Sequence, residues 1–386
     1  MIFQEPPLED VDRAVVGLID VQRERLRHFA QNSPRRWTGS LRRLSFARAV
    51  QGSNSIEGYN ASLDDAVAAI DSEPPLDPRS ETTLALFGYR DALTYIMQTA
   101  RDPYFELNKQ FLKSLHFMML SHDLSKNPGQ YRPGSIRVVK DKTGETVYDA
   151  PDIEYVDGFV TELVAYLRES SQRSPMVRAA MAHLNLAMIH PFSDGNGRMA
   201  RALQSFVLAR EGVLDPMFAS IEEWLGDNTS AYYDILAQTG QGRWNPEHSA
   251  LEWVRFCLRA HYFQAARVMR RSEEYSAVYA AIEKMIEKEG YPSRIALPLF
   301  DAALGLRLDN GRYVIATGEQ THTASRDLKQ LVERGWLLPI GEKRGRKYIR
   351  SPSLLALREK HRLPRNLADP YVLVAEGIEG PRFPGF

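Results

Sequence analysis

At 386 residues, with 44% hydrophobic and 25% charged residues, the chain is too long for a single core, and we predict two or three packed units. Lys plus Arg and Asp plus Glu both number 49, which excludes a whole-molecule field that would attract nucleic acid or membrane. A lone cysteine, Cys257, excludes an internal disulfide and a thiolate metal cage, and no apolar run approaches membrane-spanning length, so we expect a cytoplasmic protein without a membrane partner.

Most of the chain is predicted to be helical, because apolar residues recur every three or four positions. The predicted helices cover residues 11–31, 41–56, 83–99, 107–120, 156–169, 176–189, 198–211, 250–270, 273–288 and 296–304. Residues 71–82 and 170–175 are rich in proline or polar residues and predict surface connections. Two β-rich runs around the turn DKTG, within SIRVVKDKTGETVYDA, predict one small hairpin in this helical region.

The end of the chain has a different character. The stretch TASRDLKQLVERGWLLPIGEKRGRKYI predicts a helix, a strand, a basic turn and a second strand. We therefore expect an N-terminal helical region at 1–100, a core at 101–270, a mixed α and β domain at 271–352 and a tail at 353–386. The tail ends in GPRFPGF, which has too much glycine and proline to form an element, so we expect a loose or docked extension.

The segment HPFSDGNGRMAR, residues 190–201, lies between two predicted apolar helices. Gly195 and Gly197 flank Asn196, so backbone amides there can approach a ligand closely, and the next helix adds unpaired amides and a favourable dipole. Arg198 and Arg201 are three residues apart, so both guanidinium groups lie on one helix face and can bind phosphate oxygens. This pattern predicts a site for a polyphosphate.

The same segment supplies a base and a metal ligand. His190 can accept a proton from an attacking hydroxyl, and Asp194 is a hard oxygen ligand suited to Mg²⁺ shared with phosphates. Phe192 is expected to anchor the loop in the core. Each piece alone has a structural explanation, since a histidine can cap a helix, GNG can be a simple turn and paired arginines can form a solvated face. Their coincidence in twelve residues favours chemistry.

HPFSDGNGRMAR resembles the Fic signature H-x-F-x-[DE]-G-N-G-R-x-x-R at every specified position. Fic proteins transfer a nucleotidyl group, usually AMP from ATP, to a Ser, Thr or Tyr hydroxyl of a protein. The resemblance implies an adenylyltransferase in which His190 is the base, Asp194 the Mg²⁺ ligand and the GNG turn the anion hole. It also implies that Arg198 and Arg201 hold the β and γ phosphates of ATP. The implied fold is mainly α, with a Fic helical core, a β-hairpin flap and an N-terminal helical segment.

Two flanking features agree with this resemblance. The segment PGQYRPGSIRVV and its hairpin resemble the family's flap, whose exposed edge can add a strand of the target protein, although an ordinary surface hairpin would look the same. Tyr232 and Tyr233 stand where similar proteins have residues around the adenine. A tyrosine pair on a helix is as often packed in a core, so both explanations stay open.

SNSIEG, residues 53–58, matches the inhibitory motif [ST]-x-x-x-E-[GN] of many Fic proteins. With Gly58 as the cap, Glu57 lies in the last turn of a predicted helix, where the helix dipole disfavours a negative charge by about 0.3–1 kcal/mol. In the family this glutamate pairs with the second arginine of the signature, here Arg201, and misplaces the ATP phosphates. The resemblance thus implies a class II protein held off by Ser53, Glu57 and Gly58. In several relatives the same glutamate also supports removal of AMP.

The C-terminal stretch resembles the recognition helix and wing of a winged-helix domain, an α+β module that also occurs in Fic chains. Residues 321–350 hold eight Lys or Arg against three Asp or Glu, a local net charge of +5. Such a face suits DNA phosphates, but winged helices also dock proteins, and a basic wing is often only solvated.

Three functions remain in view. The first is an autoinhibited adenylyltransferase that uses ATP and Mg²⁺ on protein hydroxyls, its own included, with DNA, a protein or a second copy as partner of the C-terminal module. The second is a DNA-binding regulator whose Fic core senses a nucleotide, although sensing alone would not require His190. The third is a Fic-like kinase, which would transfer the γ rather than the α phosphate, or an enzyme that removes AMP from proteins; the intact GNGR core favours AMP transfer over the kinase.

Overall fold

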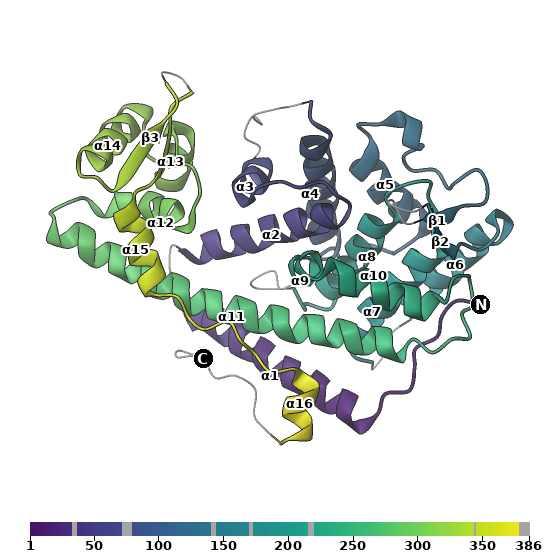
Figure 1. Ribbon diagram of the computed structural model, residues 1–386. Coiled ribbons are helices and arrows are strands. Elements are labelled where there is room, and N and C mark those ends of the chain that lie inside the picture. The colour runs from purple at the N-terminus through teal and green to yellow at the C-terminus, as the bar shows by residue number, and fades with distance from the viewer. Residues whose placement is uncertain are drawn as a thin grey trace. The chain divides into compact units, whose positions relative to one another are not determined.

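The computed structural model describes residues 1–32, 37–71, 79–139, 144–169, 173–214, 220–342 and 345–377. Its described residues form helices and two small antiparallel hairpins (Figure 1), which confirms the predicted mainly α class. The chain divides into two compact units, one built from residues 1–27, 45–266 and 367–377 and the other from residues 28–44 and 267–366. Within the described part, every helix is too short or too polar to cross a bilayer.

The front of the first unit is helical, as predicted. Its elements are α1 (Asp10–Asn32), α2 (Trp37–Ile56), α3 (Leu63–Ile70), α4 (Glu81–Thr99) and α5 (Lys109–Leu120). The short helix α3 was not predicted, although its start is marked in the sequence: Ser62 and Asp65 form a capping box, in which each side chain bonds the backbone N–H of the other residue. Two amide groups at the helix start are thereby satisfied.

The predicted hairpin is present and is followed by the helices on both sides of the signature. These elements are β1 (Arg137–Val139), β2 (Thr146–Asp149), α6 (Ile153–Arg168), α7 (Pro175–Ile189) and α8 (Asn196–Arg210). β1 and β2 pair antiparallel, with Val138 opposite Tyr148. The buried Tyr148 donates its hydroxyl hydrogen to the Met188 carbonyl at 2.9 Å, so the hairpin is fixed to the end of α7. Residues 141–143 of the expected DKTG turn lie outside the described residues.

Helix α7 is the centre of this unit. Nearly every side chain from Met176 to Ile189 is buried, so the helix is covered on all faces and packs most extensively on α8. A buried polar network links the two helices to the next one: His183 Nδ1 bonds Gln204 Oε1, and His183 Nε2 bonds the Tyr232 hydroxyl at 2.8 Å. Both ring nitrogens of His183 have a partner, so these contacts fix the register of α7 against α8.

Helices α9 (Glu222–Asp227) and α10 (Thr229–Gly240) follow, and α9 packs against the C-terminal half of α2. The contact is made by glycines. A Cβ atom on Gly52 would lie 2.5 Å from the Glu222 carbonyl oxygen, and one on Gly226 would lie 2.9 Å from the Gly52 Cα. The two backbones therefore approach at a distance that only glycine allows.

One long helix replaces two predicted ones. We predicted separate helices at 250–270 and 273–288, but α11 runs unbroken from Leu251 to Lys288, so the predicted break was wrong. No glycine or proline interrupts the stretch. Arg270 and Glu274, four residues apart and on either side of the predicted break, form an ion pair at 2.9 Å that stabilises the helix there.

The second unit continues with short elements. They are η2 (Ser293–Ile295), α12 (Ala296–Leu304), α13 (Asn310–Thr317), α14 (Thr321–Glu333), β3 (Leu337–Ile340) and β4 (Lys347–Arg350). β3 pairs antiparallel with β4, and an isolated bridge joins Leu308 to Tyr348 of β4. The predicted helix, strand, turn and strand are confirmed here, except that Lys343 and Arg344 of the turn lie outside the described residues. The short helix α13 was not predicted.

The tail holds more structure than its composition suggested. We expected no element beyond Ser353, but α15 (Pro352–Lys360) and α16 (Pro370–Ala375) are both helical. Each begins with proline directly after a capping residue, Ser351 or Asp369, whose side chain accepts a backbone N–H. Asp369 also bonds Arg259 of α11 at 2.8 Å, so α16 is docked on the first unit. The final GPRFPGF lies outside the described residues.

The glycine contact between α2 and α9 predicts a sharp difference between two alanine variants. We expect Gly52→Ala to lower the free energy of unfolding by about 1–3 kcal/mol, because its Cβ has no space against the backbone of α9. Gly17→Ala in α1, where the added Cβ meets nothing within 4 Å, is the matched control and should be neutral or slightly stabilising. Equal denaturant midpoints for the two variants would refute the contact.

The buried His183 predicts a pH dependence of stability. Burial lowers the pKa of His183 to about 3, against 6.5 for an ordinary histidine, so below pH 6.5 the unfolded chain takes up a proton that the folded chain refuses. The free energy of unfolding therefore decreases as the pH falls from 6.5 towards 3, by about 1.4 kcal/mol per pH unit. Denaturant titrations between these values should show a slope that is about one proton smaller in His183→Asn. The exposed His322→Asn is the control, and an unchanged slope in His183→Asn would contradict the assignment.

Candidate active site

The loop between α7 and α8 has a fixed shape. His190 ends α7 with φ of 51°, a left-handed conformation that is uncommon outside glycine, and Gly195 begins α8 with φ of 75°. Across the loop, the Asn196 side chain accepts the Phe192 N–H at 2.9 Å and donates to the Phe192 carbonyl at 2.8 Å. Phe192 itself is completely buried, as predicted. Asn196 thus holds the turn from inside, and the N–H of Gly195 donates to Asp194 Oδ1 at 2.6 Å.

His116 of α5 contacts the loop and holds it in place. This residue was not predicted from the sequence. Its ring stacks on Phe192 with centroids 3.8 Å apart. Its Nδ1 accepts the Gly129 N–H at 2.8 Å, so its Nε2 carries the proton and donates to the Asp194 carbonyl at 3.0 Å. Burial lowers the pKa of His116 to about 4, which keeps the ring neutral in this arrangement. His116 therefore fixes the backbone at Asp194.

Arg132 is a second residue that the sequence analysis missed. Its side chain is buried, and its Nε donates to the His190 carbonyl at 2.9 Å. The two Nη atoms donate to the carbonyls of Gly134 and Pro151, and the Arg132 backbone N–H bonds the Pro191 carbonyl at 2.9 Å. One buried guanidinium thus connects the base of the hairpin, the start of α6 and the backbone of His190.

The His190 ring is placed to act as a base. Its Nδ1 lies 3.2 Å from the Ala187 carbonyl oxygen, which can only accept, so the proton is on Nδ1 and Nε2 keeps a free lone pair. Burial lowers the pKa of His190, so the ring is neutral near physiological pH. A neutral imidazole with an unprotonated Nε2 is the form that general-base chemistry requires.

Arg198 and Arg201 are both about 1% exposed, which excludes the solvated helix face that we had kept as an alternative. The Arg198 guanidinium lies over the Tyr59 ring at 5.2 Å. Its Nε and Nη1 are buried and have no hydrogen-bond partner among the described residues. Buried donors without acceptors are costly, so Arg198 is prepared for an anion.

Arg201 is bound to the predicted inhibitory motif. Its Nη2 donates to Glu57 Oε1 at 2.6 Å and to the Ser53 carbonyl at 3.0 Å, and its Nε donates to Ser53 Oγ at 2.8 Å. Burial by itself lowers the pKa of Arg201, but the carboxylate of Glu57 outweighs burial and raises it above its ordinary value. The arginine is therefore charged and paired within the protein.

Glu57 reaches into the anion-binding turn itself. A Cβ atom on Gly197 would lie 2.4 Å from Glu57 Oε1, so the carboxylate rests against the first turn of α8, where the helix dipole favours a negative charge. At the other end, Gly58 has φ of 85° and ends α2, as predicted for a cap. The Glu57 backbone thus follows the C-terminus of α2, where a negative charge is unfavourable, while its carboxylate lies at the N-terminus of α8, where a negative charge is favourable.

The two tyrosines of α10 have different surroundings. Tyr232 is 1% exposed, bonds His183 and lies under Arg201, whose Cζ is 5.9 Å from the ring centre. Tyr233 is 46% exposed and donates its hydroxyl hydrogen to the Ile56 carbonyl at 3.2 Å, at the end of α2. Contact of this pair with an adenine stays a prediction.

Asp194 is held by a cation that the sequence analysis did not single out. The Nζ of Lys126, in the short helix η1 (Leu124–Lys126), lies 3.0 Å from Asp194 Oδ2 and 3.3 Å from Glu81 Oε1. Tyr59 donates to the same Glu81 oxygen at 3.0 Å. Lys126 and Glu81 therefore connect Asp194 with Tyr59, which directly follows the inhibitory motif at residues 53–58. Burial raises the pKa of Asp194, but the hydrogen bond and charge of Lys126 outweigh burial, so the pKa lies below its ordinary value and the carboxylate stays ionised.

This arrangement fits a magnesium ion only in part. Within the described residues there is no group of three or more His, Cys, Asp or Glu that could enclose a metal ion. Mg²⁺ characteristically keeps one or two protein carboxylates and takes further oxygens from substrate phosphates and water. The half-exposed Asp194, beside the phosphate-binding turn, suits that mode of binding.

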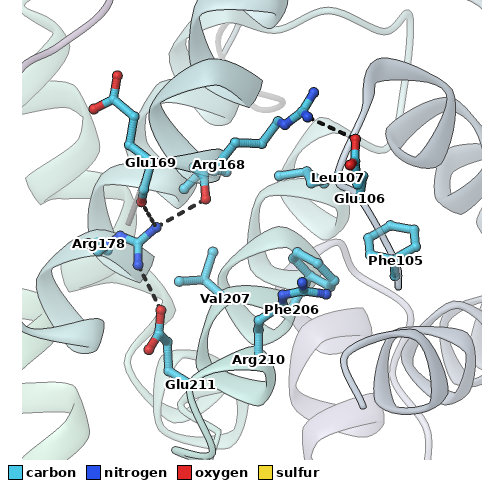
Figure 2. A pocket seen from close by; sticks show the side chains of 11 residues that line it. Phe105, Glu106, Leu107, Arg168, Glu169, Arg178, Phe206, Val207, Arg210 and Glu211 are labelled. Carbon is cyan, nitrogen blue, oxygen red and sulfur yellow. Dashed lines mark hydrogen bonds and ion pairs between the residues drawn. The ribbon is translucent and has the colours of Figure 1, made fainter. Parts of the chain in front are cut away.

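A separate hollow of about 350 Å³ lies at the C-terminal ends of α6 and α8 (Figure 2), and it differs from the loop site. Four of its charged side chains form two ion pairs: Arg178 bonds Glu211 at 2.7 Å, and Arg168 bonds Glu106 at 2.8 Å, as Figure 2 shows. None of the residues 190–201 lines it. The unpaired donors of Arg198 therefore mark the loop as the better candidate site.

Residues 106–208 match the model of the Fic/DOC family, a stretch that contains α7, the loop and most of α8. The chain is 25% identical over 260 residues to the protein adenylyltransferase Fic of Nematostella vectensis, covering 66% of this chain and 55% of that protein. It is 25% identical over 245 residues to the protein adenylyltransferase fic-1 of Caenorhabditis elegans, covering 62% and 45%. The chain thus spans about half the length of the curated relatives it matches.

Solved structures agree in fold. A Fic family protein from Desulfovibrio desulfuricans G20 covers 91% of this chain and 99% of its own, with a TM-score of 0.55 and 21% identity. Fic-1 from C. elegans covers 67% of this chain and 71% of its own, with a TM-score of 0.52 and 23% identity. The loop between α7 and α8 carries the complete signature, and residues 106–208 around it match the Fic/DOC family, so this part of the chain is similar to that family.

Proposed function

We propose that this chain is a protein adenylyltransferase that moves AMP from ATP to a Ser, Thr or Tyr hydroxyl of a protein, and that Glu57 holds it in an inhibited state. The observation that carries the proposal is the pair of buried arginines on the first turns of α8, one with unpaired donors and the other bound to a carboxylate. The names of the relatives, protein adenylyltransferase Fic and fic-1, support the same reaction.

In the proposed reaction, the α8 amides with Arg198 and Arg201 bind the β and γ phosphates. Asp194 would hold Mg²⁺, which supplies charge neutralisation on the phosphates when it is bound. The target oxygen forms a bond to the α phosphorus as the bond from that phosphorus to the bridging oxygen breaks, and pyrophosphate leaves. His190 Nε2 accepts the proton of the target hydroxyl. The rest of catalysis is positioning and electrostatic stabilisation.

The proposed inhibition follows from competition for one place. The carboxylate of Glu57 and the terminal phosphate of ATP both require Arg201 and the amide-rich turn at Gly197. While Glu57 is there, the phosphates have to bind elsewhere, and an error of about 1 Å in position can reduce the rate by about 10². Ser53 supports the brake by accepting hydrogen bonds from Nε and Nη2 of Arg201. This is the class II arrangement.

The hairpin is the proposed docking place for the target. On the side of β2 away from β1, Asp149 donates its N–H to the Gly242 carbonyl at 2.9 Å and accepts the Trp244 N–H at 3.2 Å. The outer edge of β2 is therefore partly covered. β1 is the other strand of this two-stranded sheet, and its Val139 side chain is exposed. The outer edge of β1 supports addition of an extended target segment that places its hydroxyl near His190.

We propose further that the second unit is a winged-helix module that recruits a partner, either DNA, a protein or a second copy of the chain. The order α12, isolated β-bridge at Leu308, α13, α14, β3 and β4 supports this assignment.

The experiment for the transferase uses ATP labelled at the α or at the γ phosphate, with Mg²⁺ and the full chain. Glu57→Gly should incorporate α label into itself or into lysate proteins about 10²-fold faster than the wild type, because Arg201 is released to the nucleotide. Label from the γ phosphate should not be incorporated. Incorporation from γ alone would indicate a kinase and would rule out AMP transfer.

Two controls separate the brake from the chemistry. Adding His190→Ala to Glu57→Gly should abolish incorporation, because the base is lost. Glu376→Gly removes an exposed carboxylate after α16 and should behave as the wild type. If the wild type and Glu57→Gly were equally active, Glu57 would not be a brake.

Arg132 gives a separate test of the site, because it touches only backbone carbonyls around His190. In the Glu57→Gly background, we expect Arg132→Met to lower kcat by about 10²-fold with little change in KM for ATP, since the His190 backbone loses its anchor. Arg132→Lys, which keeps one cationic donor, should recover part of kcat. A rise in KM with kcat unchanged would place Arg132 in ATP binding, and a melting temperature lowered equally in both variants would leave it a purely structural role.

A further inference from the structure

The charge of this chain is divided unevenly along its length. Residues 267–366 contain 20 Lys or Arg against 12 Asp or Glu, a net charge of +8 in a chain whose total is zero. The rest of the protein is correspondingly acidic. A basic module attached to an acidic body directs an anionic partner to that module.

Two helices of the second unit have the spacing of a helix-turn-helix. α13 ends at Thr317 and α14 begins at Thr321, so the turn between them has three residues, and it starts with Gly318 at φ of 72°. β3 and β4 follow directly, and α14 packs on both α13 and β3 (Figure 1). The order is that of proteins that place the second helix in the major groove.

The inner face of α14 is rigidly held. Ala324, Leu328 and Leu331 are completely buried. Asp327, the acidic residue in the middle of the helix, also points inward: Arg294 bonds its two oxygens at 2.7 and 3.1 Å, and the Tyr313 hydroxyl donates to it at 2.7 Å. Its negative charge is therefore neutralised inside the unit and does not oppose an anion outside.

The outer face of α14 carries donors and cations. Arg326 is 59% and Lys329 is 77% exposed. The side chains on this face are Thr321, His322, Ser325, Arg326, Lys329 and Gln330, with Glu333 in the last turn. Hydroxyls, an amide and cations on one rigid helix are the groups that bind base edges and phosphates in the major groove. Arg346, exposed beside β4, adds a cation on the hairpin.

We infer that the outer face of α14 binds duplex DNA in the major groove, with the β3–β4 hairpin along the phosphate backbone. The inference rests on the proposed winged-helix module but not on the proposed transferase chemistry, because it uses neither ATP nor the loop between α7 and α8. The transferase would thereby be localised on DNA, and a target bound to the same duplex would have a raised effective concentration.

The test is fluorescence anisotropy of the full chain with random-sequence duplexes of about 20 base pairs, roughly two helical turns. Binding should weaken as salt rises from about 50 mM to about 200 mM, with log Kd linear in log salt. The double variant Arg326→Ala and Lys329→Ala should bind at least about 10-fold more weakly at low salt and reduce the slope by about two, one for each lost phosphate contact.

A matched control keeps the outcome specific. Lys284→Ala with Lys288→Ala removes the same charge from the exposed side of α11 in the same unit, and it should bind DNA as the wild type does. His190→Ala should also bind normally, which separates a failure of this inference from a failure of the proposed reaction. No binding at about 50 mM salt, or equal losses in both double variants, would overturn the inference and leave protein docking as the use of α14.

Discussion

The buried Arg201 is the interaction on which the candidate site depends. A guanidinium that is 1% exposed needs acceptors, and those it has come from Ser53 and Glu57, about 145 residues earlier in the chain. The pairing stabilises the charge of Arg201 and simultaneously fills the first turn of α8 with a carboxylate. One contact thus satisfies a structural requirement and occupies the place prepared for an anion. Arg198, one turn earlier, has no such acceptor for its Nε and Nη1 among the described residues.

The backbone that carries Glu57 is held by close contacts, whereas the Glu57 side chain is partly exposed to solvent. The backbone of α2 lies against α9 at glycine distances, and Tyr233 bonds the carbonyl of Ile56 directly before Glu57. Glu57 itself is 25% exposed and reaches Arg201 across open backbone at Gly197. A carboxylate on a fixed backbone can leave Arg201 by rotation about its side-chain bonds, without the cost of separating two helices that only glycines bring together.

Much of the fold could be predicted because its signals are local. Apolar spacing identified the long helices, and the β-rich runs identified both hairpins, since each pattern is set by the geometry of its own element. The predictions failed where the signal was short or needed a contact. α3 and α13 each have only eight residues, and α15 and α16 depend on a capping side chain before a proline. α11 was predicted as two helices, although the stretch contains no glycine or proline that would end the first one.

The site shows the same division between local and distant information. His190, Asp194, Gly197, Arg198 and Arg201 could be found from the sequence because they share one turn and its helix, and their residue types are those that the chemistry needs. His116, Lys126 and Arg132 could not. Each acts on the loop from 58 to 78 residues away, and the hydrogen bonds of His116 and Arg132 to the loop go to its backbone carbonyls, which are the same in every residue. A side chain that positions a loop through its backbone leaves no pattern in the loop's own sequence, so only the folded structure can identify it.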